Sequence, residues 1–183
     1  KLREGNRVSI SNTSQDEILS NQRAYGIWGK YNRPFQDIDF TKRSIFHEVF
    51  KEKMDAGKLI GGDANNRIIM YVSAMMEVKS SMGVIVAAPT AGSCGALPGA
   101  LFGTAHATQL PEDELVKAML SAGLIGVFIA AHATFAAEVG GCMAETGSGG
   151  GMAAAAIVQM QGVTLQQSIA AASLALQNSL GII

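Results

Sequence analysis

The sequence predicts a mostly α-helical fold, a compact helical domain with Ala/Gly-rich central helices. Two observations support this prediction. Helix-start signals recur along the chain, whereas only residues 83–88 resemble a strand, and that segment is short. The composition combines 48% hydrophobic residues with only 6% aromatic residues and 21 glycines. Because small side chains let backbones approach closely, we expect a tightly packed core with few large rings.

The first helices are expected in the charged, aromatic-rich part of the chain. A capping box at residues 14–17 precedes the stretch 22–31, so we interpret residues 1–40 as an N-terminal helical arm. Apolar side chains at helical spacing then predict a helix over 45–54. Gly57 follows as its stop signal.

Three further helices are predicted in the second part of the chain. Residues 64–82 carry an apolar stripe at helical spacing. Pro111 followed by three acidic residues is a strong helix start, and we expect this helix to run to about Glu138. A capping box at 164–167 opens another helix, which is expected to end near residue 178, ahead of a glycine.

The uncharged run 120–137 is nearly long enough to span a membrane. It contains Ser121, His132 and two glycines, and it lacks the flanking aromatic residues of a typical span. Apolar, alanine-rich helices also occupy the centre of all-α domains. We therefore favour a buried helix of a soluble protein over a membrane span.

Charge and cysteine content narrow the class of protein. The formal net charge is −1 and there is no basic block, which argues against a nucleic-acid-binding protein. Cys94 and Cys142 cannot form a disulfide framework and are interpreted as reduced thiols. Residues 1–12 lack the apolar region of a signal peptide. We expect a single cytoplasmic domain over residues 1–183.

The first motif with chemical potential is Ala-Ala-Pro-Thr-Ala-Gly-Ser-Cys-Gly at residues 87–95, ahead of an apolar helix. Its backbone N–H groups could converge on an anion. The alternative is a turn into the helix that needs glycine for backbone reasons. A nucleophilic role for Cys94 is less favoured, because Ala96 stands where the nucleophile-elbow pattern requires glycine.

The second motif is the glycine-rich segment 138–152. It does not match a dinucleotide-binding fingerprint, because Met152 replaces the last glycine, and there is no Walker-type sequence. A thiolate beside a helix start would be stabilised by the helix dipole, so Cys142 is a candidate metal ligand or reactive cysteine. The alternative is a buried, inert cysteine in a glycine-rich packing seam.

Two common cofactors find no support in the pattern. The two cysteines, His106 and His132 are too dispersed for a zinc motif, so zinc is set aside. Pyridoxal phosphate requires a Schiff-base lysine, and Lys79 and Lys117 lie in no evident phosphate-binding context.

Residues 82–95, 135–156 and 172–181 together resemble the α subunit of the iron–sulfur-dependent L-serine dehydratases. The resemblance implies conversion of L-serine to pyruvate and ammonia with a [4Fe–4S] cluster instead of pyridoxal phosphate. Three cysteines would hold the cluster and leave one iron open as a Lewis acid. It also implies a separate β subunit and an oligomeric protein, with neither nucleic acid nor membrane as partner.

Site residues follow from the resemblance, position by position. Cys142 matches the first cluster cysteine, in a Gly-Cys-x-x-Glu context that includes Glu145. The other two cluster cysteines are expected after Ile183, so residues 1–183 alone are not expected to hold the cluster. The substrate loop corresponds to Thr90, Ala91, Gly92 and Ser93.

The base that removes the substrate proton is not specified by the resemblance. Glu145, His132 and His106 are the candidates, and the base could also come from a partner or from chain beyond Ile183. A preference for serine over threonine stays open. Two alternatives remain, namely a non-enzymatic helical interaction or membrane domain, and a thiol hydrolase that uses Cys94.

Overall fold

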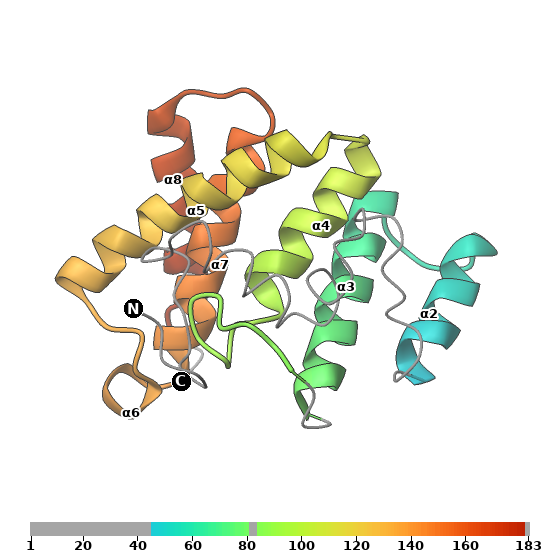
Figure 1. Cartoon of the computed structure of the whole chain (residues 1–183), viewed down its shortest axis with the longest axis horizontal. Coiled ribbons are helices and arrows are strands. Elements are labelled where there is room, and N and C mark those ends of the chain that lie inside the picture. Colours follow the sequence, from blue (N-terminus) through green and yellow to red (C-terminus); the bar gives the residue numbers. More distant parts are fainter. Residues whose placement is uncertain (1–44, 81–83, 182–183) are drawn as a thin grey trace.

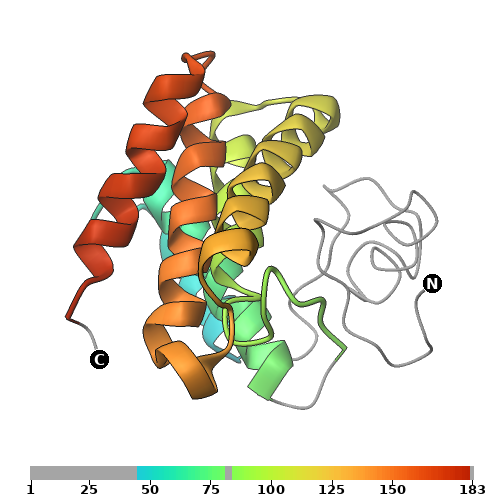
Figure 2. The ribbon, with the colours of Figure 1, turned by 90° about the vertical axis from the view of Figure 1, so that its left-hand side faces the viewer.

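The computed structural model describes residues 45–80 and 84–181, and within them the chain forms seven helices and no strand. The helices are α2 (Ile45–Asp55), α3 (Asp63–Ser80), α4 (Ala96–Thr108), α5 (Glu112–His132), α6 (Ala137–Gly140), α7 (Cys142–Gln159) and α8 (Leu165–Ser179). Helix α7 is central, since it packs against α4, α5, α6 and α8 (Figure 1). Figure 2 shows α8, α7 and α5 side by side. The mostly helical prediction is confirmed.

Helices α3 and α4 pack closely because glycine recurs every fourth residue on one face of α4, at Gly95, Gly99 and Gly103. A Cβ added at Gly99 would lie 2.8 Å from the backbone nitrogen of Val72. One added at Gly103 would lie 2.5 Å from that of Ile68. Both distances are shorter than real Cβ contacts. The two backbones therefore approach where only glycine fits.

The hydrophobic core lies between α3, α4, α5 and α7 and is built mainly from small side chains. Its largest fully buried side chains are Phe102, Met75, Leu97 and Leu101, beside Pro98 and Cys94. Five alanines distributed over α3, α5 and α7 are completely buried: Ala74, Ala118, Ala122, Ala155 and Ala156. The expected tight core with few large rings is confirmed.

Several predicted helix ends agree with the structure. Gly57 follows α2 with a positive φ of 66°, as a helix stop requires. The capping box of Thr164 and Gln167 opens α8, and Gly181 follows that helix with φ of 86°. The predicted arm, residues 1–40, and its capping box lie outside the described residues.

The helix predicted to continue to Glu138 ends earlier, at His132. After it, Ala133 is extended, and the Thr134 hydroxyl accepts a hydrogen bond from the Ala136 backbone N–H at 3.0 Å. This local bond offers the backbone an alternative to the helix ladder. The chain turns there into the short helix α6 and then into α7.

The strand predicted over 83–88 is not formed in the part of it that the structure describes. Residues 84–87 have no regular secondary structure, and the Ala88 N–H is bonded to the Thr90 carbonyl in a local turn at 3.1 Å. A short apolar segment needs neighbouring strands to pair with, and none exists among the described residues.

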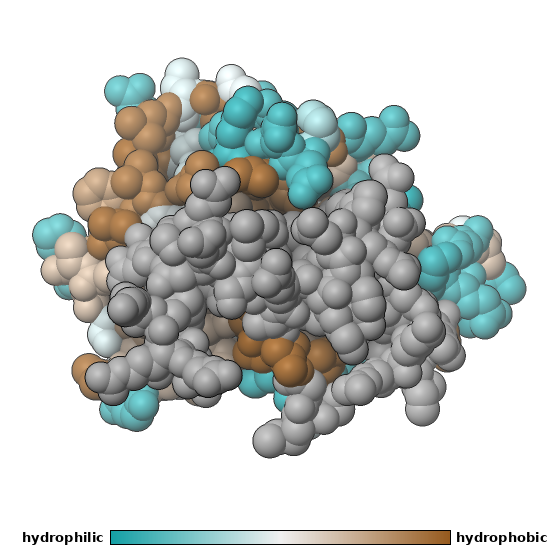
Figure 3. Space-filling model, in the orientation of Figure 1, coloured by the Kyte–Doolittle hydropathy of each residue, from teal (hydrophilic) through white to brown (hydrophobic). Residues whose placement is uncertain are grey.

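The expectation that 120–137 is a buried helix holds for only one face of α5. In its most apolar stretch only 28% of the residues are buried, and by length and composition the helix could cross a membrane. Leu115, Ala118 and Ala122 face the core. The outer face exposes large apolar side chains, which form apolar surface along α5 in Figure 3: Val116, Leu120, Leu124, Val127 and Phe128.

Candidate active site

The loop 87–95 leads directly into α4 and is held by its own hydroxyl groups. The Ser93 backbone N–H donates to Thr90 Oγ1 at 3.2 Å, and the two hydroxyl oxygens lie 3.0 Å apart. Ser93 Oγ also donates to the Ala88 carbonyl at 3.3 Å. The peptide bond between Ala88 and Pro89 is cis. The two hydroxyl side chains thus brace the loop into a defined shape.

Glu145 from the first turn of α7 lies directly against this loop. Its Oε1 accepts a hydrogen bond from the Gly92 backbone N–H at 3.3 Å. A Cβ added at Gly92 would lie only 2.0 Å from Glu145 Oε2. Gly92 does not have a positive φ, so the glycine is needed for close approach and not for its backbone angles. The two motifs found in the sequence therefore meet at one place.

The glycine run of the second motif lies inside α7, not before it. The helix begins at Cys142, and Gly149 falls two turns later. A Cβ added at Gly149 would lie 2.8 Å from Ser93 Cβ, and one at Gly151 would lie 3.1 Å from Leu176 Cγ. These glycines let α7 pack closely against the loop on one side and α8 on the other.

The two cysteines have opposite environments. Cys94 is buried, with 1% of its surface exposed. Burial raises the pKa of the Cys94 thiol, Lys79 acts to lower it, and Glu145 acts to raise it further. The net increase keeps Cys94 protonated near neutral pH, which is the wrong state for the nucleophile of a thiol hydrolase.

Cys142 is exposed at the first residue of α7, so the alternative of a buried, inert Cys142 is wrong. Its sulfur is therefore accessible from solvent at the start of this helix. Among the described residues, no three His, Cys, Asp or Glu side chains lie close enough together to hold a metal ion. The described residues therefore offer an exposed thiol but no complete metal site.

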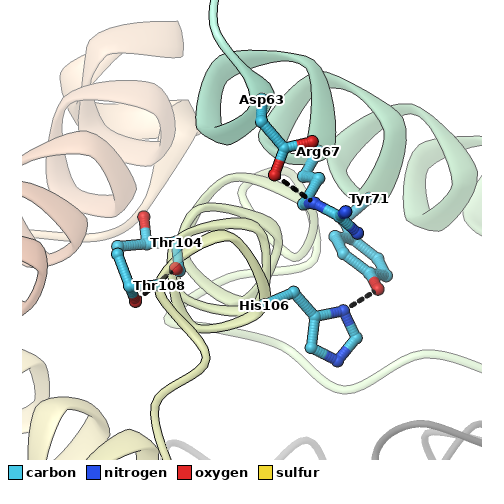
Figure 4. Close-up of polar contacts among 6 residues, drawn as sticks. All are labelled: Asp63, Arg67, Tyr71, Thr104, His106 and Thr108. Carbon is cyan, nitrogen blue, oxygen red and sulfur yellow. Dashed lines mark hydrogen bonds and ion pairs between the residues drawn. The ribbon is translucent and has the colours of Figure 1, made fainter. Parts of the chain in front are cut away.

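Of the three candidate bases, Glu145 contacts the loop, whereas His106 lies away from it. His106 is ten residues beyond the start of α4, which is about 15 Å along the helix axis. Its Nδ1 shares a hydrogen bond with the Tyr71 hydroxyl of α3 (Figure 4). His132 is exposed at the last residue of α5.

The environment of His106 favours an uncharged imidazole. Burial, followed by the charge of Arg67, lowers the pKa of His106 to about 4. Burial also raises the pKa of Tyr71 to about 12, with Arg67 opposing the rise. Arg67 itself pairs with Asp63 at 2.7 Å, as Figure 4 shows. These groups join α3 to α4 away from the loop.

The last turns of α3 also reach the loop, which sequence reasoning missed. A Cβ added at Gly95 would lie 2.9 Å from Met76 Cγ and 3.1 Å from the Val72 carbonyl oxygen. Lys79 is three residues after Met76 and therefore on the same face of the helix. The helical spacing within the predicted 64–82 helix shows that Met76 and Lys79 share a face. It does not show that this face packs against the loop.

Comparison with known proteins places this arrangement in a family. The family model described as serine dehydratase alpha chain matches residues 25–183. The probable L-serine dehydratase alpha chain of Bacillus subtilis (strain 168) is 39% identical over 128 residues, 70% of this chain and 43% of the relative. The L-serine dehydratase alpha chain of Peptoniphilus asaccharolyticus is 41% identical over 144 residues, 79% of this chain and 47% of the relative.

A relative named L-serine dehydratase TdcG, from Escherichia coli (strain K12), is 32% identical over 116 residues, which is 63% of this chain and 26% of the relative. No solved structure matches. The chain spans about half the length of the alpha-chain relatives it matches. The matched region contains the loop, Cys142 and Glu145, and the chain belongs to the serine dehydratase alpha chain family.

Proposed function

We propose that this chain forms part of an L-serine dehydratase, a lyase that converts L-serine to pyruvate and ammonia. The family and the names of the relatives support this activity. The observation that carries the proposal is the meeting of the 87–95 loop with the first turn of α7, where Glu145 contacts Gly92. One place thus combines backbone donors, a carboxylate and, three residues earlier, an exposed thiol.

The reaction requires loss of a poor leaving group and removal of a weakly acidic Cα proton. A substrate held in fixed orientation lowers both barriers. In the proposal the braced loop, residues Thr90 to Ser93, has a fixed shape against which the amino acid is oriented. Among the three candidate bases, the position of Glu145 supports a direct role at the substrate. His106 and His132 stay predictions whose positions give no such support.

We propose a [4Fe–4S] cluster as the cofactor, with Cys142 as one ligand. The exposed thiol at a helix start is suited to this role. The remaining ligands are proposed to come from outside the described residues, as the resemblance implies. In the proposal, the described part of the chain supplies this one ligand only.

We further propose a separate β subunit, an oligomeric assembly and a cytoplasmic location. The relatives named alpha chain support the existence of a second kind of subunit. The exposed apolar face of α5 supports an assembly larger than this chain alone, because contiguous apolar surface of this kind often marks interaction sites.

The test is anaerobic reconstitution of the full-length protein with iron and sulfide, in the presence of its β subunit, followed by a pyruvate assay with L-serine. Cys142→Ala is expected to abolish both cluster absorbance and pyruvate formation. Thr146→Ala, one turn further along the exposed side of α7, is the matched control and should retain both. Absence of cluster and pyruvate in the folded parent protein would refute the proposal.

A further inference from the structure

Two opposite charges reach the loop from opposite helices. The carboxylate of Glu145 comes from α7 and lies against Gly92. Lys79 comes from the last turn of α3, one helical turn beyond Met76, which packs against Gly95. Glu145 therefore contacts the loop at Gly92, and Lys79 lies one helical turn beyond the α3 contact with Gly95.

The two charges act on the same buried thiol, that of Cys94. Cys94 lies within this part of the loop, and its thiol experiences both side chains. Lys79 acts to lower the pKa of Cys94 and Glu145 acts to raise it, while burial, the largest effect, also raises it. These opposite effects on the pKa of Cys94 are consistent with the packing of α3 and α7 against the loop, which brings Lys79 and Glu145 near the thiol.

Within the part of the chain that the structure describes, neither side chain takes part in an ion pair. Across residues 45–80 and 84–181, ion pairs join Lys51 to Asp55, Arg67 to Asp63, and Lys117 to Glu114. Lys79 and Glu145 take part in none of these. Both side chains are half-buried, where an unpaired charge is less favourable than in water. A ligand that carries both complementary charges would relieve this cost.

We infer that Lys79 and Glu145 form a recognition pair for the two charged groups of an α-amino acid, with Lys79 receiving the carboxylate and Glu145 the ammonium group. The inference rests on the proposed function and adds to it the residues that select the substrate class. It predicts discrimination against hydroxy acids, which lack the ammonium group, and against simple amines, which lack the carboxylate.

The experiment measures how each variant binds serine analogues that lack one of its functional groups. Full-length protein, loaded with its cluster and with its β subunit, is assayed for L-serine dehydration in the presence of L-alanine, 3-hydroxypropionate or ethanolamine. Lys79→Met should raise the inhibition constants of L-alanine and 3-hydroxypropionate about tenfold or more and leave that of ethanolamine unchanged. Lys79→Arg should restore most of the affinity.

Glu145→Gln should give the complementary pattern. Its amide oxygen can still accept the Gly92 hydrogen bond, so the loop keeps its shape while the charge is lost. L-alanine and ethanolamine should bind about tenfold more weakly, and 3-hydroxypropionate should bind unchanged. KM for L-serine should rise in both variants. If Glu145→Gln instead lowers kcat and leaves KM unchanged, Glu145 is the base, and its assignment to the ammonium group is wrong.

Two other outcomes overturn the inference. Equal weakening of all three ligands would indicate a damaged loop and no charge recognition, and circular dichroism would report such a change. Unchanged binding in both variants of a protein that dehydrates L-serine would refute the recognition pair and leave the proposed function standing. A folded, cluster-loaded parent that makes no pyruvate would refute the proposed function itself.

Discussion

Glu145 can touch the loop backbone only because Gly92 carries no side chain. The space that a Cβ would occupy at Gly92 is filled by the carboxylate, 2.0 Å from Oε2. The flexible end of Glu145 could move away from a methyl group at small cost. Such a move would break the hydrogen bond to Gly92 and displace the charge from the loop. Adding one methyl group at this position should therefore affect activity much more than the stability of the fold.

Gly92→Ala is therefore expected to lower kcat/KM for L-serine by about 100-fold, because a displacement of about 1 Å at a reacting site has effects of this size. The free energy of unfolding should fall by less than about 1 kcal/mol. Gly150→Ala is the control, since a Cβ there meets nothing within 4 Å. That variant should keep full activity, and a large loss of stability in Gly92→Ala would contradict the explanation.

His106 makes folding stability depend on pH. Its pKa is lowered to about 4 by burial and by Arg67, whereas the imidazole of the unfolded chain titrates at its ordinary value of 6.5. Below pH 6.5 the unfolded state binds the proton more readily, so the stabilisation is present above pH 6.5 and is lost as pH falls toward 4. This group should contribute up to about 3 kcal/mol to that loss.

The measurement compares urea unfolding of the parent and His106→Gln at pH 7, 5.5 and 4.5. Carboxylates that titrate in the same range affect both proteins, so the difference between them isolates the histidine. The variant should lose less stability between pH 7 and 4.5 than the parent. Parallel curves would show that His106 is as easily protonated in the folded protein as in the unfolded chain.

The two motifs that meet in the candidate site could be recognised in the sequence, but their contacts could not. The loop and the Cys142 region are short contiguous motifs whose residue types indicate chemistry, so the sequence alone singled them out. The hydrogen bond between Gly92 and Glu145 joins residues 53 positions apart, and no local pattern encodes such a contact. Lys79 was set aside as a cofactor lysine, and a substrate contact there was doubted because many family members have Asn at this position. Its place near the loop depends on how α3 packs against α4.

At the scale of helices, the glycine face of α4 explains how α3 and α4 pack. Helices with larger side chains at the contact stay 8–10 Å apart, whereas glycine lets them approach more closely. Sequence composition predicted tight packing of small residues. It did not identify which helix pair would use the glycines, because the α7 run is equally rich in them.

Gly103→Ala is expected to destabilise the protein by about 1–3 kcal/mol, because its Cβ would meet the Ile68 backbone, which cannot rotate away. Gly123→Ala on α5 is the matched control, since a Cβ at that position has open space. The control should gain about 0.5–1 kcal/mol from helix propensity. Thermal unfolding of the two variants measures the difference, and equal Tm values would exclude a close α3–α4 contact at Gly103.

Helix ends were predictable where a side chain or a glycine marks them. The Thr164 capping box and the glycines after α2 and α8 mark ends by general stereochemical rules. The end of α5 has no such mark, because alanines on both sides of His132 are compatible with a longer helix. There the turn depends on the Thr134 hydroxyl and on the path of the chain into α7.

At the scale of the molecule, α7 is covered by its neighbours and α5 lies at the surface with an apolar outer face. Composition predicted that an apolar helix would be central, and it assigned this place to the run 120–137. Hydropathy alone could not separate the two faces of α5, because both are apolar. Only the arrangement of the other helices decides which face is covered.

A pair of substitutions tests this one-sided placement. Leu124 is 50% exposed, so Leu124→Gln should change the free energy of unfolding by less than about 0.5 kcal/mol. Ala122 is fully buried, and Ala122→Gln should cost about 3 kcal/mol through overpacking and burial of an amide. Chemical denaturation measures both, and a large loss for Leu124→Gln would mean that this face is covered in the folded protein.

The long separation between Gly92 and Glu145 also has a consequence for the order of folding during synthesis. Helices α3 and α4 are neighbours in sequence, so their pairing closes a short loop and can form early. The carboxylate that contacts Gly92 is added 53 residues after it. A nascent chain in which α3 and α4 have paired, but α7 has not yet been synthesised, therefore lacks the Glu145 carboxylate that contacts the loop. The contact between the loop and Glu145 therefore forms only after α7 has been synthesised and has docked.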